Sequence, residues 1–257
     1  MADRDSKHTE LCGAFDDRIE VRGRDLVNEL MGKLTFTQMF LLHLTGTTPS
    51  PLQVAVADAV LVTIMEHGLV PSAIAARLTY LGAPESYQGA IAAGLLGVGD
   101  RFAGTASQCG ELLDRIVAAP AAERQSLAVA TVEEFRRERR ALPGFGHPTH
   151  RRGDPRVPRL IEIVRAHGAA GRYIEALSQL ESAVSQVLGR KLPTNVSAAI
   201  AVALREAGLP TAAMRGIVLT ARCAGLVGHL SEEQREPAAD AMWQAVEREV
   251  PYRSPAK

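Results

Sequence analysis

The chain has 257 residues, with 29 Lys+Arg and 29 Asp+Glu, so its formal net charge at pH 7 is zero. Hydrophobic residues make up 46% and charged residues 23%, values typical of a soluble globular protein with one large domain or two modest ones. The balanced charge argues against nucleic-acid binding and against an acidic tail.

The cysteines and the apolar segments place the chain in a reduced compartment without a membrane anchor. Cys12, Cys109 and Cys223 lie far apart and form no CxxC pair, which favours a cytoplasmic setting. The N-terminal "MADRDSKHTE" lacks the apolar core of a signal peptide. The most apolar run, "VAVADAVLVTIM", is too short to cross a bilayer.

Almost every segment predicts helix, because alanine and leucine dominate and alternating β-branched residues are nearly absent. The first clear helix opens with Ser50 as cap, Pro51 in the first turn and Gln53 completing a capping box, and Gly68 can end it. In chain order, we expect helices over residues 51–67, 71–81, 85–97, 106–118, 121–140, 157–168, 171–189, 194–207, 211–229 and 231–248.

Two stretches near the ends of these helices carry candidate site residues. His67, in "MEHGLVPSA", follows a predicted helix, where the helix dipole favours imidazolium; it could equally cap the terminal carbonyls. The glycines of "GLLGVGDRFAG", residues 94–104, let backbone approach a ligand closely, although glycines also serve close helix packing.

A third stretch, "PGFGHPTHRRGDPR", runs from residue 143 to 156. A Gly-Phe-Gly turn here can expose His147, and Asp154 with Pro155 can begin a helix. Its arginines suit bidentate binding of carboxylate or phosphate. A basic surface loop is the alternative, but such a loop does not need Gly-Phe-Gly-His ahead of its arginines.

Two more groups predict anion binding. Arg190 and Lys191 precede a helix that Thr194 or Asn195 can cap, and a helix N-terminus with adjacent cations attracts anions. Arg222 lies within the apolar "GIVLTARCAGLVGHL" and needs an anionic partner. We expect no metal site, since the chain has no Cys/His ligand spacing and His147 and His150 lie in a proline-broken loop.

Together these stretches resemble the citrate synthase superfamily. "PGFGHPTHRRGDPR" is similar to its Pro-Gly-(Phe/Tyr)-Gly-His segment with a following Asp-Pro-Arg, "NVSAAIAVAL" to its Asn-Val-Asp segment, and "VLTARCAGLVGHLSEEQ" to its arginine-bearing C-terminal helix. The resemblance covers roughly residues 21–234. Because "GDRFAG" stands in the glycine loop, it is closer to citryl-CoA lyase and to the lyase module of ATP-citrate lyase. The ATP-dependent ligase modules are absent, so no ATP chemistry is implied.

The resemblance implies an all-α, citrate synthase-like homodimer, or a larger assembly, with two domains. Residues 1–105 and 205–257 would form a large domain, and residues 106–204 an inserted small domain that closes over the ligand. Neither nucleic acid nor membrane is an expected partner.

The resemblance also implies a role for each site residue. His147 matches the catalytic histidine and His67 a histidine that binds the oxaloacetate part. Arg156 and Arg222 match residues that bind substrate carboxylates, and Arg101 and Phe102 match other substrate-binding residues. The matches to coenzyme A-binding residues are Arg151, Lys191, Gly144 and Gly146. An arginine that the partner subunit often donates has only Arg253 as a loose candidate. Two positions depart from the family: Ser197 replaces the aspartate that moves the acetyl proton, and Pro148 replaces a frequent arginine.

The implied reaction is cleavage of citryl-CoA, or a close 3-hydroxy-acyl-CoA analogue, to acetyl-CoA and oxaloacetate. Coenzyme A enters as part of the substrate, and no tightly bound cofactor is expected. His147 would act as general base and Ser197 through water as the local acid. The alternatives are a catalytically degenerate protein that binds CoA esters or dicarboxylates, and a lyase that releases another 2-oxo acid.

Overall fold

The computed structural model describes residues 7–146 and 153–255, apart from the side chains of Arg101 and Phe102. A small antiparallel sheet comes first, formed by β1 (Cys12–Ala14), β2 (Ile19–Val21) and β3 (Arg24–Asp25), and a π-helical turn, η1 (Leu26–Leu30), follows it. This sheet was not predicted, because strands of two or three residues are too short to show an alternating pattern.

The rest of the described chain is helical, as the composition predicts. The helices are α1 (Phe36–Thr45), α2 (Pro51–Met65), α3 (Pro71–Gly82), α4 (Tyr87–Leu96), the π-helical turn η2 (Asp100–Gly104), α5 (Thr105–Ala118), the 3-10 turn η3 (Ala121–Glu123), α6 (Arg124–Arg137), α7 (Arg156–Ala166), α8 (Arg172–Leu188), α9 (Val196–Glu206), α10 (Thr211–Arg235) and α11 (Ala239–Glu249).

Local capping explains where several helices begin. Ser50 accepts from the backbone N–H of Gln53, whose side chain accepts from the N–H of Ser50, so the predicted capping box is confirmed. The predicted end of this helix is wrong by two residues, because α2 ends at Met65 and Glu66 is already extended. Gly68 does adopt the left-handed conformation, with φ of 71°, but in the loop beyond the helix.

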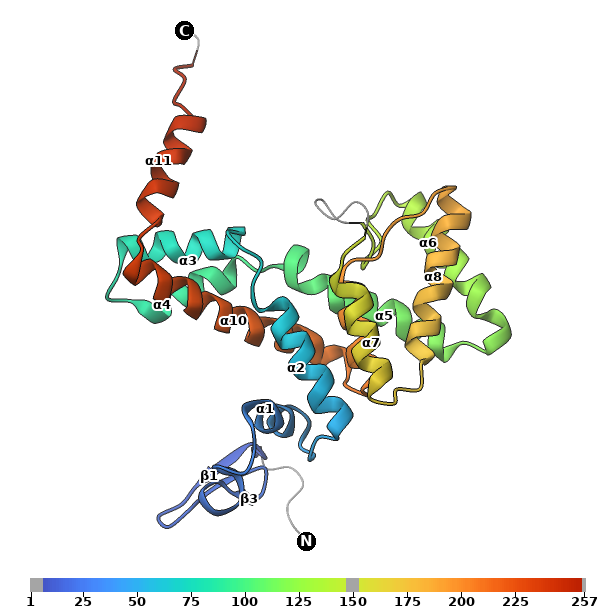
Figure 1. Cartoon of the computed structure of the whole chain (residues 1–257), viewed down its shortest axis with the longest axis horizontal. Helices are drawn as coiled ribbons and strands as arrows, with labels where there is room; N and C mark the ends of the chain where they lie inside the picture. The colour runs from blue at the N-terminus through green and yellow to red at the C-terminus, as the bar shows by residue number, and fades with distance from the viewer. Residues whose placement is uncertain (1–6, 147–152, 256–257) are drawn as a thin grey trace.

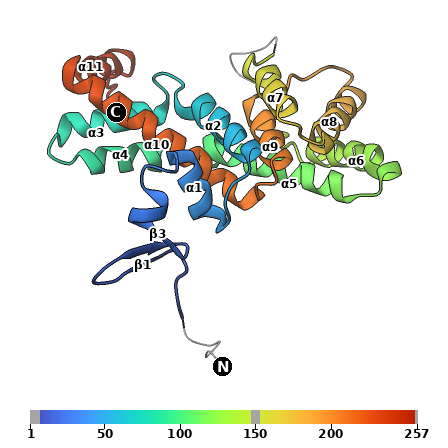
Figure 2. The ribbon, with the colours of Figure 1, turned by 60° about the horizontal axis from the view of Figure 1, so that its bottom comes forward.

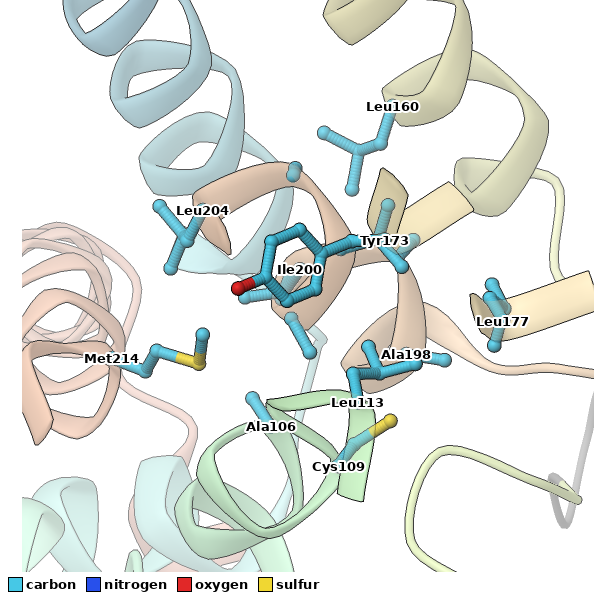
Figure 3. Packing of buried hydrophobic residues seen from close by; sticks show 14 of the residues in the cluster. Ala106, Cys109, Leu113, Leu160, Tyr173, Leu177, Ala198, Ile200, Leu204 and Met214 are labelled. Carbon is cyan, nitrogen blue, oxygen red and sulfur yellow. The ribbon is translucent and has the colours of Figure 1, made fainter. Parts of the chain in front are cut away.

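The helices form two groups, one around the large buried cluster and one around a smaller cluster of Ala76, Ala90, Leu226 and Leu230 (Figure 1). α3 and α4 pack together and against α10, while α5, α6, α7, α8 and α9 gather on the other side. α9 lies at the centre: every residue from Ala198 to Leu204 is buried, and Ile200 and Leu204 meet Tyr173, Leu113 and Met214 in the core (Figure 3). The rotated view shows α2 and α10 crossing from one group toward the other (Figure 2).

α10 is longer than predicted. It runs unbroken from Thr211 to Arg235, where the sequence suggested a break near residue 230. The chain turns only after it, because one oxygen of the buried Glu233 accepts from the N–H groups of Ala238 and Ala239, each at 2.8 Å. This cap starts α11, which packs against α3 and points away from the other helices (Figure 1).

Gly225 allows α10 to touch the end of α2. A Cβ at this position would lie 2.1 Å from the carbonyl oxygen of Met65 and 3.4 Å from Oε2 of Glu66. A Cβ would clash with the backbone carbonyl of Met65, which cannot move aside as a flexible side chain could, so only glycine permits this approach. The loop that carries His67 is thereby held against the helix that carries Arg222.

We predict that Gly225→Ala destabilises the protein by about 1–3 kcal/mol, because overpacking against backbone forces the two helices apart. Gly228→Ala is the matched control, since it lies in the same helix with open space around its Cβ position; it should be neutral or stabilising by up to about 1 kcal/mol. Urea denaturation of both variants measures the difference. Equal stability for the two would show that α2 and α10 do not meet at Gly225.

Candidate active site

The backbone that leads to His147 is fixed to the start of α9. Gly146 N–H donates to the carbonyl of Pro193 at 2.8 Å, Asn195 N–H to the carbonyl of Gly144 at 2.9 Å, and Asn195 Nδ2 to the carbonyl of Gly146 at 2.8 Å. The side chain of Asn195 also accepts from the N–H of Ser197, so Asn195 is the cap of α9. His147 itself, like Pro148, His150, Arg151 and Arg152, lies outside the described residues.

The two glycines of the Gly-Phe-Gly turn are required by conformation. Gly144 and Gly146 have φ angles of 85° and 76°, in the left-handed region that favours glycine. A Cβ on Gly144 would also lie 2.8 Å from Sγ of Cys109 and 2.9 Å from Cβ of Ala198. These constraints explain both glycines structurally, and their predicted contact with coenzyme A stays a prediction.

Asp154 and Arg156 form a buried ion pair at the other end of this segment. Asp154 has a fully buried carboxylate, which accepts from Nε and Nη2 of Arg156 at 2.9 and 2.8 Å and from the N–H of Val196 at 3.1 Å. α7 begins at Arg156, one residue before the expected range 157–168, and its N-cap is Pro155 rather than the predicted Asp154. The side chain of Asp154 accepts from the N–H of Arg156 at 3.1 Å. The predicted carboxylate-binding arginine thus already holds a carboxylate of its own chain.

This pair determines the ionisation of Asp154. Burial alone raises the pKa of a carboxyl group, but the hydrogen bonds and charge of Arg156 and the N–H of Val196 outweigh it. They lower the pKa of Asp154 to about 2.

Ser197 lies in the first turn of α9 and is half-buried. Its hydroxyl donates to the hydroxyl of Thr105 at 3.2 Å, and Thr105 begins α5 directly after η2. Ser197 therefore lies beside the glycine-rich stretch. The sequence did not single out Thr105, although it directly follows "GDRFAG".

Arg222 is the second predicted carboxylate-binding arginine, and it is buried, with 8% of its surface exposed. Among the described residues, no hydrogen bond or ion pair reaches its guanidinium; the negative charge nearby is Glu66. Burial lowers the pKa of Arg222 below its ordinary value, and the charge of Glu66 acts in the opposite direction. A buried guanidinium in this state is a site for an anion.

The exposed His67 lies in the loop after α2, whose preceding residues Met65 and Glu66 approach α10 at Gly225. Glu66 holds this loop, because its Oε1 accepts from the N–H groups of His67 and Gly68, each at 2.7 Å, and from Nε2 of His229 at 3.0 Å. Glu66 is half exposed, and partial burial tends to raise the pKa of its carboxyl group. The three donors outweigh this tendency and keep the pKa below its usual value.

A small apolar cluster lies between two sets of site residues: Glu66, His67 and Arg222 on one side, and Ser197 and Thr105 on the other. It contains Val98, Ala103 and Val218, with Ile64 and Leu219 packed against it. Ile64 precedes Glu66 and His67, Val218 lies one turn before Arg222, and Ala103 lies two residues before Thr105. The structure therefore brings together the α2–α3 loop, α10, η2 and the start of α9.

The glycine-rich stretch serves packing as well as the site. A Cβ on Gly94 would meet Leu226 at 2.7 Å and the carbonyl of Ser72 at 2.9 Å, so this glycine lets α4 approach α10 and α3. Asp100 ties η2 to α10 through Nη1 of Arg215 at 2.5 Å. The side chains of Arg101 and Phe102 are outside the described part, so their predicted substrate contacts stay predictions.

Lys191 is exposed at the rim of a separate groove of about 680 Å³ between α7, α8 and the segment before α9. The groove is lined by Gly153, Asp154, Val157, Pro158, Ser178, Glu181, Ser182, Ser185, Lys191, Leu192, Pro193 and Thr194. Its size suits part of a cofactor-sized ligand.

Two further findings concern metals and membranes. The described residues contain no group of three or more His, Cys, Asp or Glu side chains that could hold a metal ion. In the same part of the chain, no helix combines the length and apolarity that crossing a bilayer requires.

Comparison with known proteins agrees with this architecture. Residues 11–244 match the model for the citrate synthase C-terminal domain, and the chain belongs to the citrate synthase family. Among solved structures, citryl-CoA lyase from Hydrogenobacter thermophilus is similar with a TM-score of 0.85 and 28% identity, over 98% of this chain and 96% of that one.

Other relatives carry different names. ATP citrate lyase from Methanothrix soehngenii, with a TM-score of 0.79 and 19% identity over all of this chain and 43% of that one, shares the fold. A putative citrate synthase 2 from Mycobacterium tuberculosis is 28% identical over 78% of this chain. The chain spans about half the length of the curated relatives it matches, 53% in this case.

We predict that Asp154 contributes about 2 kcal/mol to the free energy of unfolding near neutral pH, because its pKa falls from 3.8 to about 2 on folding. This contribution is complete above about pH 5 and is lost as the pH falls through the folded-state pKa of about 2. Asp154→Asn should therefore be less stable than the parent at pH 7, and the gap should close at low pH. Urea denaturation across this range measures it, with the exposed Asp16→Asn as control. A gap that does not change with pH would contradict the ion pair.

Proposed function

We propose that this protein cleaves citryl-CoA, or a close 3-hydroxy-acyl-CoA analogue, to acetyl-CoA and oxaloacetate. The observation that carries the proposal is the buried guanidinium of Arg222, which has no hydrogen bond or ion pair among the described residues and feels the charge of the half-exposed Glu66, the residue before His67. The near end-to-end likeness to a citryl-CoA lyase supports the same reading.

In the proposed reaction, His147 takes the proton of the substrate hydroxyl as general base. The C–C bond then breaks, its electron pair enters the thioester enolate, and the former hydroxyl carbon becomes the carbonyl of oxaloacetate. Arg222 and His67 bind the oxaloacetate part. Arg156 is already bonded to Asp154 through Nε and Nη2, so it would meet a substrate carboxylate with Nη1. Fixed carboxylates align the breaking bond.

The enolate requires a donor at its oxygen and an acid at its carbon. We propose that backbone N–H groups between Gly99 and Phe102 supply the first. For the second, the hydroxyl pair of Ser197 and Thr105 stands at the site, with a separation of 3.2 Å. A hydroxyl is a weak acid, so we propose that the pair relays to the enolate carbon, through water, the proton that His147 took from the substrate hydroxyl, which leaves the charge of the enzyme unchanged.

Coenzyme A would enter as part of the substrate, without a tightly bound cofactor. Lys191 at the rim of the α7–α8 groove supports a role beside a CoA phosphate, and Arg151 is the second proposed contact. Gly144 and Gly146 allow the backbone there to lie close to α9 and leave room for the thioester arm.

A second candidate is a catalytically degenerate family member that binds CoA esters or dicarboxylates. Ser197 favours it, since a serine replaces the family's proton-moving carboxylate. The relatives named as putative citrate synthases also leave the reverse reaction, condensation of acetyl-CoA with oxaloacetate, as an alternative.

We also propose a homodimer with the two-domain division at residues 105/106 and 204/205. Exposed apolar side chains on and after α11 support a second copy as partner: Trp243 is 54%, Val250 74% and Tyr252 87% exposed. Arg253 follows Tyr252 and could reach a neighbouring site. A cytoplasmic location fits the free cysteines described at Cys12, Cys109 and Cys223.

We expect purified protein to release oxaloacetate from citryl-CoA, measured by coupling to malate dehydrogenase and following NADH. His147→Ala should lower turnover about 10²–10⁴-fold, the usual contribution of a general base, with little change in CoA affinity.

Arg222→Met should weaken oxaloacetate binding at least tenfold, whereas Arg235→Met at the end of the same helix should not. A parent that binds oxaloacetate and CoA but releases no product would favour the degenerate binder.

Ser197→Asp should accelerate exchange of the acetyl-CoA methyl protons with solvent, because a carboxylate can take a carbon-bound proton that a serine hydroxyl cannot take near neutral pH. Deuterium uptake into acetyl-CoA, followed by NMR with an oxaloacetate analogue bound, compares parent and variant. Thr105→Ala serves as control, since it removes the neighbouring hydroxyl without adding a base. If the variant folds and binds CoA but exchanges no faster, Ser197 does not occupy the proton-transfer position.

A further inference from the structure

A buried polar relay lies behind the loop of His67. Arg77, on α3, has only 2% of its surface exposed, and its Nη1 donates to Oε2 of Glu233 at 2.5 Å. Its Nε and Nη2 both point at Nδ1 of His229, at 3.1 and 3.0 Å, and Nη2 also pairs with Glu232. Two of these partners, His229 and Glu233, are themselves buried on α10.

This arrangement determines which nitrogen of His229 carries the proton. A guanidinium only donates hydrogen bonds, so Nδ1 must accept and the proton stays on Nε2. Nε2 then donates to Oε1 of Glu66 at 3.0 Å. Arg77 therefore orients a donor toward Glu66 although it makes no contact with Glu66 itself.

Glu66 connects His229 to the backbone of the His67 loop through hydrogen bonds. The oxygen that accepts from His229 also accepts from the N–H groups of His67 and Gly68. Its second oxygen lies against α10 at Gly225, one turn from Arg222. One carboxylate thus holds the His67 backbone in place and stands beside the guanidinium that lacks any other partner in the described part of the chain.

We propose that Glu66, held by the Arg77–His229 relay, is the positioning residue of the dicarboxylate site and the resident counter-ion of Arg222. It makes two separable contributions: its acceptor oxygen fixes the His67 loop, and its charge stabilises Arg222 until a substrate carboxylate arrives. The ligand class rests on the proposed function, whereas the hold on the loop rests on the hydrogen bonds alone.

Two substitutions separate these contributions. Glu66→Ala removes both the acceptor and the charge. Glu66→Gln keeps an acceptor oxygen of the same reach but removes the charge, so it retains the loop geometry while relieving repulsion of an incoming carboxylate. The exposed Glu111→Ala on α5 is the control for loss of a carboxylate elsewhere.

The first measurement is amide hydrogen exchange of the native protein by NMR, with urea denaturation to monitor global stability. In Glu66→Ala, we expect the amides of His67 and Gly68 to exchange at least tenfold faster while core amides of α9 keep the parental rate. Glu66→Gln should leave both amides as in the parent. His229→Ala should accelerate the same two amides less strongly, because it removes only the relay. A rise in exchange across the whole protein, or none at His67 and Gly68, would overturn the proposal.

The second measurement is calorimetric binding of oxaloacetate and, separately, of coenzyme A. We expect Glu66→Ala to weaken oxaloacetate about tenfold, and Glu66→Gln to bind it at least as tightly as the parent. Coenzyme A affinity should stay within twofold in both variants, because the proposed CoA groove lies at α7 and α8. Equal oxaloacetate affinity in Glu66→Ala and Glu66→Gln would overturn the positioning role. Failure of the parent itself to bind oxaloacetate would instead refute the proposed function.

Discussion

The close contact between α10 and the end of α2 at Gly225 is the constraint on which the candidate site depends. It brings together two segments far apart in the sequence, the loop with Glu66 and His67 and the helix with Arg222. A buried guanidinium is costly unless an anion compensates it. The short separation of the helices places the charge of Glu66 near Arg222, while half of the side-chain surface of Glu66 remains exposed.

The two predicted carboxylate-binding arginines differ in a way that has functional meaning. Arg156 is held through Nε and Nη2 by a carboxylate that has no exposed surface, so its position is fixed while Nη1 stays available. Arg222 has only a nearby charge and no hydrogen-bonding partner among the described residues. If both arginines bind a ligand as proposed, binding should change the surroundings of Arg222 more than those of Arg156.

The sequence predicted those features that local chemistry determines. The all-α fold and the capping box at Ser50 follow from composition and from residues close together in the chain. The family follows from several short motifs along the chain. Thr194 and Asn195 were both candidate caps for α9, and the structure shows that Asn195 is the cap. The break near residue 230 was wrong, because burial of Glu233 and its bonds to Ala238 and Ala239 set the end of α10. The surroundings of Arg222 and His229 could not be predicted, because Glu66 and Arg77 lie more than 150 positions away in the sequence. Asp154, by contrast, lies two residues from Arg156, so the sequence motif could have predicted that these two side chains pair.

The anchoring of the Gly-Phe-Gly segment has a consequence for how the fold responds to single substitutions. The carbonyl of Gly146 accepts from Asn195 and the carboxylate of Asp154 accepts from Val196, and these two partners are consecutive residues. Asn195 also caps α9, and Asp154 is paired with Arg156 at the start of α7. One change at Asn195 would therefore disturb the Gly-Phe-Gly turn and the first turn of α9 at the same time, so these two parts of the fold should respond to mutation as one unit.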